Sequence, residues 1–174
     1  MLVFKSIIFY ISLLIWTLFM GIICIPFLLL PSKFLKLPTK IWIKVIFIFL
    51  KNICNITHKI EGMENFPDEA VLITCKHQSA FETLALYYYL KDCFFVHKKE
   101  LFLIPVFGQY LYKANMVSID RTGGTKTMRK MLDDVKLKLA SGSSIIIFPE
   151  GTRKIPGSKP DYKTGFIGIY NHTK

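Results

Sequence analysis

The pattern of apolar and polar residues divides the chain into three parts, of which the first is a long apolar run. Residues 7–30 are almost wholly apolar, a stretch long enough to cross a bilayer. Only Lys5 precedes the run, which contains no small-residue cleavage site, so it predicts a retained anchor rather than a removed signal peptide. Several lysines follow it: Lys33, Lys36, Lys40, Lys44 and Lys51. By the positive-inside rule, this bias predicts a protein of the inner (cytoplasmic) membrane, with the remaining chain on the cytoplasmic side.

The second part, residues 41–56, has the pattern of an amphipathic helix. Its apolar residues recur at helical spacing and lysines interrupt them. Because the segment is short and charged for a second span, we expect an interfacial helix among the lipid headgroups. A helix packed on the soluble part of the protein is the alternative. Residues 1–56 are therefore predicted to form a membrane anchor and interfacial helix in contact with membrane phospholipid.

The third part alternates between strand-like and helix-like runs. The strand-like runs are residues 70–75, 93–97, 116–119 and 143–148, and the helix-like runs are residues 79–90, 104–113 and 124–140. Strands that alternate with helices in this way predict an α/β fold, with a largely parallel sheet flanked by helices, over residues 57–174. In such a sheet, site residues gather at the carboxyl ends of the strands.

Composition narrows the possible partners. The chain of 174 residues has 23 Lys and Arg against 12 Asp and Glu, a net charge of +11. This balance suits an anionic partner such as membrane phospholipid or a phosphorylated substrate. The lysines lie in apolar surroundings without the stacked aromatic pattern of nucleic-acid modules, so we expect no nucleic-acid partner. The four cysteines are widely spaced, which predicts reduced thiols and no metal site.

A polar stretch, residues 74–83, interrupts the third part between its first strand and first helix. It contains His77 and Glu82, which would point about 140° apart on a continuous helix. Ser79 and Glu82 match a capping box, which predicts Ser79 as the N-cap and places His77 just before the helix. Glu82 could then fix the tautomer of the His77 imidazole and leave its other nitrogen to accept a proton from a hydroxyl group. A capped helix with an ordinary surface histidine is the alternative.

Two glycine-containing turns follow later strands. Residues 120–124 and residues 149–153 each place an arginine beside Gly and Thr, a composition that can surround a phosphate with guanidinium and backbone N–H donors. The chain has only three arginines, and two of them, Arg121 and Arg153, lie in these turns. Both turns are therefore candidate phosphate sites, with ordinary strand-end turns as the alternative.

Together these stretches resemble the glycerolipid acyltransferase family, which includes 1-acyl-sn-glycerol-3-phosphate acyltransferases. That family is marked by an H-x4-D motif, a turn ending in I-D-R, and the motif F-P-E-G-T-R. The matching stretches here are H-Q-S-A-F-E at residues 77–82, S-I-D-R at residues 118–121 and F-P-E-G-T-R at residues 148–153. The resemblance covers about residues 40–174.

The resemblance implies an O-acyltransferase that transfers an acyl group from an acyl thioester to the sn-2 hydroxyl of 1-acyl-sn-glycerol-3-phosphate, giving phosphatidic acid in phospholipid biosynthesis. His77 would be the general base and Glu82 would orient it. The remaining implied residues bind the lysophosphatidate acceptor: Lys98 and Arg121 at its glycerol phosphate, and Glu150, Gly151, Thr152 and Arg153 around it. The donor would be acyl-CoA or acyl carrier protein, with no cofactor and no metal.

Two departures from the family pattern leave alternatives open. Glu82 stands where the family has Asp, and the chain ends at Lys174, before the family's fourth motif, which implies a domain incomplete at its C-terminus. One alternative is therefore an inactive, truncated membrane-binding remnant. Others are an enzyme acting on glycerol-3-phosphate or another lysophospholipid, although H-Q-S favours lysophosphatidate, and a thioester hydrolase that uses Cys75 with His77.

Overall fold

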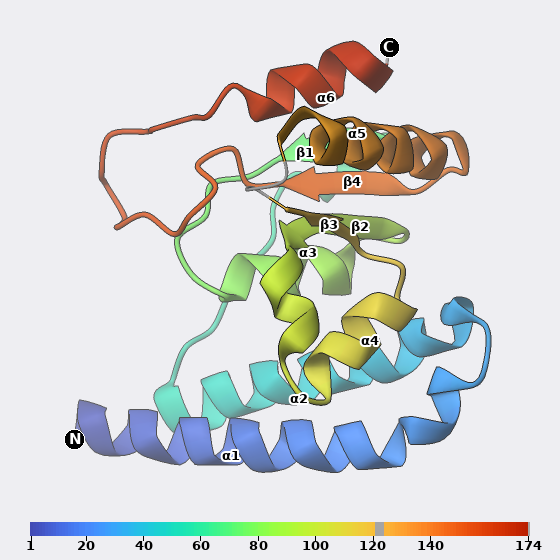
Figure 1. The fold of residues 1–174 in the computed structure, drawn as a ribbon. Coiled ribbons are helices and arrows are strands. Elements are labelled where there is room, and N and C mark those ends of the chain that lie inside the picture. The colour runs from blue at the N-terminus through green and yellow to red at the C-terminus, as the bar shows by residue number, and fades with distance from the viewer. Residues whose placement is uncertain (121–123, 174) are drawn as a thin grey trace. The chain divides into compact units, whose positions relative to one another are not determined.

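The computed structural model describes residues 1–120 and 124–173 (Figure 1). The chain forms two compact units. The first combines Met1–Phe66 with Ile104–Ala114, and the second combines Pro67–Leu103 with Asn115–Lys174.

Two long helices, α1 (Leu2–Ile23) and α2 (Lys36–Cys54), lie side by side in the first unit (Figure 1). The short 3-10 turns η1 (Ile25–Leu28) and η2 (Ser32–Leu35) connect them. The Trp16 indole donates a hydrogen bond to the Trp42 carbonyl, and the Trp42 indole donates one to the Thr17 hydroxyl, both at 3.1 Å. These reciprocal bonds fix the register of the two helices.

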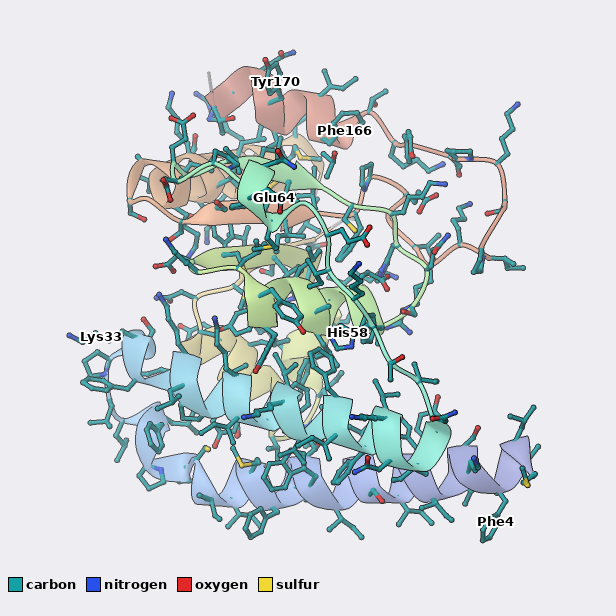
Figure 2. The ribbon with its side chains drawn as sticks, turned by 180° about the vertical axis from the view of Figure 1, so that it is seen from behind. Phe4, Lys33, His58, Glu64, Phe166 and Tyr170 are labelled. Atoms are coloured by element: carbon teal, nitrogen blue, oxygen red, sulfur yellow. The ribbon has the colours of Figure 1, made fainter. Side chains whose placement is uncertain are left out.

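An apolar helix is present as predicted, but α1 ends at Ile23, before the end of the apolar run of residues 7–30, and most of its large side chains are exposed. Among the described residues, α1 is the one helix that is long and apolar enough to cross a membrane. Phe4, for example, is 67% exposed and points away from α2 (Figure 2). In α2, by contrast, Ile43 and Ile46 are buried while Lys44 is exposed, which is the amphipathic pattern predicted for this segment.

A short helix, α4 (Phe107–Lys113), also belongs to the first unit. The Tyr110 hydroxyl donates a hydrogen bond to the Gly21 carbonyl at 2.7 Å. The sequence predicted this helix from residue 104, but it begins later. Pro105 cannot donate a backbone hydrogen bond and Val106 has a φ of 66°, so the preceding residues form a turn instead.

The second unit is built on the predicted parallel sheet. Its strands are β1 (Leu72–Thr74), β2 (Cys93–Lys98), β3 (Val117–Ile119) and β4 (Ser144–Ile147). All pair in parallel, in the spatial order β1-β4-β2-β3. The fold class predicted from the sequence is confirmed, although β1 and β4 are shorter than their apolar runs.

Helices cover the sheet of the second unit. The helices α5 (Gly124–Ala140) and α6 (Gly165–Thr173) lie on one side, and α3 (Phe81–Tyr89) lies on the other (Figure 1). Two short 3-10 turns remain: η3 (Met63–Asn65) belongs to the first unit and η4 (Lys99–Leu103) to the second. The α5 bounds match the predicted run, whereas α6 was not predicted.

The core of the second unit lies between the sheet and the layer of α5 and α6. Its buried side chains are Phe94, Val117, Met131, Val135, Ile145, Ile147 and Ile169. Removing such a side chain from water contributes about 1.5–3 kcal/mol. Because side chains alternate along a strand, Phe95 and Ile146, which are also buried, point to the opposite face, on which the candidate site is built.

Candidate active site

The first functional segment joins β1 to α3. Beyond the end of β1, the Cys75 N–H donates to the Ile147 carbonyl at 3.0 Å, so pairing with β4 continues for one more residue. Helix α3 then starts at Phe81 with Ala80 as its N-cap, one residue later than the predicted N-cap, Ser79. The contacts of the predicted capping box are nevertheless present, because the Ser79 hydroxyl accepts the Phe81 N–H at 3.0 Å and Glu82 accepts the Ser79 N–H at 2.9 Å.

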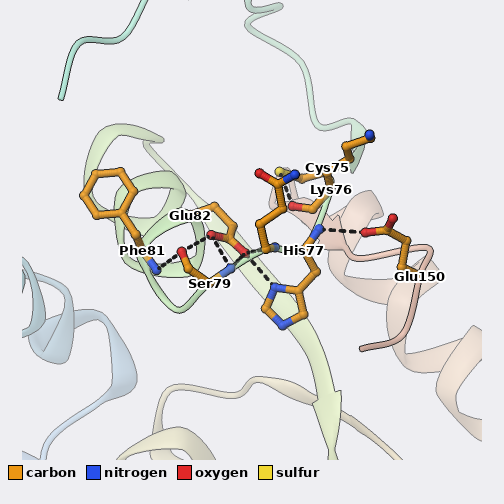
Figure 3. Close-up of polar contacts among 8 residues, drawn as sticks. Cys75, Lys76, His77, Ser79, Phe81, Glu82 and Glu150 are labelled. Carbon is orange, nitrogen blue, oxygen red and sulfur yellow. Dashed lines mark hydrogen bonds and ion pairs between the residues drawn. The ribbon is translucent and has the colours of Figure 1, made fainter. Parts of the chain in front are cut away.

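The turn before α3 brings His77 and Glu82 together (Figure 3). Glu82 Oε1 lies 2.7 Å from His77 Nδ1 and also accepts the backbone N–H groups of Gln78 at 2.8 Å and Ser79 at 2.9 Å. Oε2 accepts the Ser79 hydroxyl at 2.6 Å. The methylene that Glu has beyond Asp is thus accommodated by the turn, and the carboxylate sits among four donors.

The electrostatic environment keeps Glu82 ionised. Burial raises the pKa of its carboxyl, but hydrogen bonds from the Ser79 hydroxyl and backbone, from its own N–H and from His77 outweigh burial and lower the pKa to about 2. An ionised carboxylate only accepts hydrogen bonds, so Nδ1 of His77 must carry the proton. In the neutral imidazole this tautomer leaves the free lone pair on Nε2, which is the form that a general base requires.

The second functional segment is the turn after β4. The Gly151 N–H donates to the Phe148 carbonyl at 2.9 Å, which closes a four-residue turn with Pro149 in its second position. Gly151 has a φ of +65°, a conformation that favours glycine. The motif F-P-E-G therefore encodes the turn directly.

Residues 148–154, which include this turn, contact His77 in three ways. The buried Glu150 side chain accepts the His77 N–H at Oε2, at 3.1 Å (Figure 3). The Lys154 N–H donates to the His77 carbonyl at 2.7 Å. The Phe148 ring stacks on the imidazole, with centroids 4.1 Å apart and planes 19° apart. Phe148 and Lys154 were not singled out from the sequence, although Phe148 follows the strand end directly and stands within the quoted motif.

Three other predicted binding residues lie at or beyond strand ends of the same sheet. Lys98 is the last residue of β2 and is exposed, and Thr152 and Arg153 are exposed beyond β4. Arg121 lies outside the described residues. The neighbouring Asp120 carboxylate is held by the Lys99 ammonium at 3.0 Å, a contact that the sequence analysis did not anticipate.

Cys75 has the environment of an unreactive thiol. Its Sγ donates to the Lys76 carbonyl at 3.3 Å. Burial, together with the negative charges of Glu82 and Glu150, raises the pKa of the thiol. Since the thiolate is the nucleophilic form, these surroundings disfavour the hydrolase alternative. Within residues 1–120 and 124–173, no group of three or more His, Cys, Asp or Glu could hold a metal ion.

The chain is similar in fold and in sequence to known proteins. The solved structure titled "1-acyl-sn-glycerophosphate (LPA) acyltransferase, PlsC" from Thermotoga maritima matches with a TM-score of 0.70 and 24% identity, over 97% of this chain and 71% of that one, which supports the fold. Curated 1-acyl-sn-glycerol-3-phosphate acyltransferases also match. The one from Pseudomonas aeruginosa is 29% identical over 71% of this chain and 48% of its own length. The one from Helicobacter pylori is 36% identical over 58% of this chain and 42% of its own length.

This chain thus spans less than half the length of those two curated relatives. The family model described as Acyltransferase matches residues 57–173, which include the His77 and Glu150 segments and most of the chain. The protein belongs to this acyltransferase family.

Proposed function

We propose that this protein transfers an acyl group from an acyl thioester to the sn-2 hydroxyl of 1-acyl-sn-glycerol-3-phosphate, giving phosphatidic acid for phospholipid biosynthesis. The observation that carries the proposal is the 2.7 Å contact between His77 Nδ1 and Glu82 Oε1, which leaves Nε2 as a base at the carboxyl end of β1. The names of the curated relatives support the choice of acceptor.

In the proposed reaction, Nε2 of His77 removes the proton of the acceptor hydroxyl as its oxygen attacks the thioester carbonyl carbon. A C–O bond forms, the C–S bond breaks, and the departing thiolate takes the proton back from the imidazolium. The Glu82 carboxylate stabilises the positive charge that the imidazole carries between these steps. Because a thiolate is a good leaving group, we propose that acyl-CoA or acyl carrier protein serves as donor, without cofactor or metal.

The acceptor phosphate is proposed to bind at the carboxyl ends of neighbouring strands. β4 pairs with both β1 and β2, so Lys98 at the end of β2 and Arg153 beyond β4 belong to adjacent strand ends. Arg121 follows β3 and is assigned to the same phosphate. Gly151 and Thr152 would shape the acceptor site between these cations.

An amphiphilic acceptor also gives the N-terminal helices a role. We propose that α1, with its exposed apolar side chains, attaches the protein to the inner (cytoplasmic) membrane. The lysines that follow α1, beginning with Lys33 at the α1–α2 connection (Figure 2), favour a catalytic domain on the cytoplasmic side.

The test is acyl transfer from labelled acyl-CoA, and separately from acyl carrier protein, to 1-acyl-glycerol-3-phosphate by the protein in detergent. We expect transfer with at least one donor, and its loss in His77→Ala. His172→Ala is the matched control, because His172 pairs with Asp133 on the α5 and α6 side of the sheet, and it should leave transfer unchanged. Transfer that persists in His77→Ala would contradict the mechanism, and preferential use of glycerol-3-phosphate would contradict the proposed acceptor.

A further inference from the structure

We infer that residues 148–154 hold the general base in place, and that Glu150 is a positioning residue for His77 rather than a ligand of the acceptor. This inference rests on the proposed function for its catalytic consequence. The contacts that carry it join residues 73 positions apart in the sequence.

The first step concerns the backbone of His77. Both of its hydrogen-bonding groups are taken by residues 148–154, since Glu150 Oε2 accepts its N–H at 3.1 Å and the Lys154 N–H donates to its carbonyl at 2.7 Å. A backbone held at both groups cannot rotate its peptide units without breaking a bond. The Cα atom that carries the imidazole is therefore fixed.

The second step follows from strand register. In the β1–β4 pair, Thr74 lies opposite Ile147, so continued parallel pairing would bring His77 opposite Glu150. The turn closed by Gly151 takes the β4 backbone away from that path. The Glu150 side chain fills the place of the missing backbone acceptor, which accounts for a carboxylate at this position of the turn.

The third step concerns the imidazole ring. The Phe148 ring lies nearly parallel to it at 4.1 Å, and the Phe95 ring lies nearly parallel to Phe148, with centroids 6.0 Å apart and planes 11° apart. Stacking on Phe148 restrains the plane of the ring, while Glu82 restrains its rotation through Nδ1. Nε2 is left as the nitrogen available for a proton.

Burial and charge argue against a role for Glu150 in holding the acceptor phosphate. Its side chain is only 3% exposed. A buried carboxylate is costly unless it is hydrogen-bonded, and a negative charge beside a phosphate would weaken binding. Its hydrogen bond from the His77 N–H compensates part of the free-energy cost of burial. The carboxylate therefore has a structural role at this position, which is to hold the His77 backbone.

The test compares Glu150→Gln, which keeps an oxygen acceptor, with Glu150→Ala, which does not. Since small misplacements of a catalytic group cost up to about 100-fold, we expect Glu150→Ala to lower kcat about 10-fold to 100-fold with KM for the acceptor within about 2-fold. Glu150→Gln should stay within about 3-fold of wild type. Asp68→Asn, which removes an exposed negative charge, is the control. Equal losses in both variants, or a raised KM with kcat unchanged, would overturn the inference.

A second readout does not depend on turnover. Amide hydrogen exchange of the peptide that carries His77 should accelerate in Glu150→Ala and stay at the wild-type rate in Glu150→Gln, while β4 remains protected in both. Unchanged exchange in Glu150→Ala would show that the contact does not restrain His77. If the wild-type protein transfers no acyl group, the proposed function fails, and the exchange comparison still decides whether Glu150 positions His77.

A variant pair at Phe148 covers the case in which Glu150→Ala does not fold. Phe148→Tyr keeps the stacked ring and should retain kcat, whereas Phe148→Leu keeps apolar packing without the ring and should lower kcat about 10-fold at constant KM. Phe166→Leu is the matched control, because Phe166 packs on the α5 and α6 side of the sheet. An unchanged kcat in Phe148→Leu would show that stacking on the Phe148 ring does not position His77.

Discussion

Replacing Glu82 by Gln removes one negative charge and keeps the shape of the side chain. The amide oxygen can take the place of Oε1, which accepts hydrogen bonds from His77, Gln78 and Ser79, and the amide nitrogen can donate to the Ser79 hydroxyl. The His77 tautomer is therefore retained. The variant loses the charge and the 3.2 Å hydrogen bond from the Ser79 N–H to Oε2, so its effects set an upper bound on what ionisation of Glu82 contributes.

The size of that contribution follows from the lowered pKa. The carboxyl changes from an ordinary value of 4.5 to about 2 in the folded protein. At about 1.4 kcal/mol per pH unit, this corresponds to about 3 kcal/mol, which solvent screening reduces to about 1–2 kcal/mol. Because the folded pKa is the lower one, this stability is fully present above pH 4.5 and is lost as the pH falls toward 2.

Thermal unfolding of both proteins, in one detergent and at a series of pH values, measures the effect. At neutral pH we expect Glu82→Gln to melt about 2–8 °C below wild type, and the difference to shrink between pH 4.5 and 2 as wild-type Glu82 becomes protonated. Its kcat should fall about 10-fold to 100-fold, since the imidazolium loses a charged partner. A difference in melting temperature that stays constant down to pH 2 would refute the reasoning.

Three further predictions follow from the site. Glu82→Asp shortens the side chain by about 1.5 Å, which breaks the 2.7 Å contact with Nδ1, so kcat in the transfer assay should fall; full activity would show that the turn relaxes. Gly151→Ala places a side chain at a φ of +65° and should destabilise the protein by about 1–2 kcal/mol in thermal unfolding, whereas Gly168→Ala, in open space on α6, should not. Cys75→Ala should retain acyl transfer, because the thiol has no part in the mechanism; a loss comparable to that of His77→Ala would restore the hydrolase hypothesis.

Local patterns in the sequence were sufficient to predict most helices and strands of the second unit. The four strands and α5 lie where apolar runs predicted them, because buried parallel strands and an amphipathic helix leave distinct periodicities. The proximity of His77 and Glu82 was also predictable, since both lie within one short turn. The capping-box contacts of Ser79 and Glu82 were predicted correctly, although the helix begins one residue later than the sequence indicated.

Features that depend on strand order could not be predicted in this way. Nothing in the periodicity indicates that β4 inserts between β1 and β2, so the contact of His77 with Glu150 had no sequence signal beyond the motif itself. Helix α6 was missed because its short, glycine-containing sequence has no clear helical pattern, and it is packed against α5 through Ile169.

Because β4 is inserted beside β1, the position of the proposed base, His77, depends on the sheet. β1 has only three residues and pairs with β4, and the segment that follows β4 supplies Glu150 and Lys154, which bind the backbone of His77. A substitution in the buried part of β4, such as at Ile146, would therefore disturb the sheet and the base together. A substitution beyond the strand end, such as at Glu150, changes the position of the base while the sheet remains, which is why that residue separates catalysis from stability.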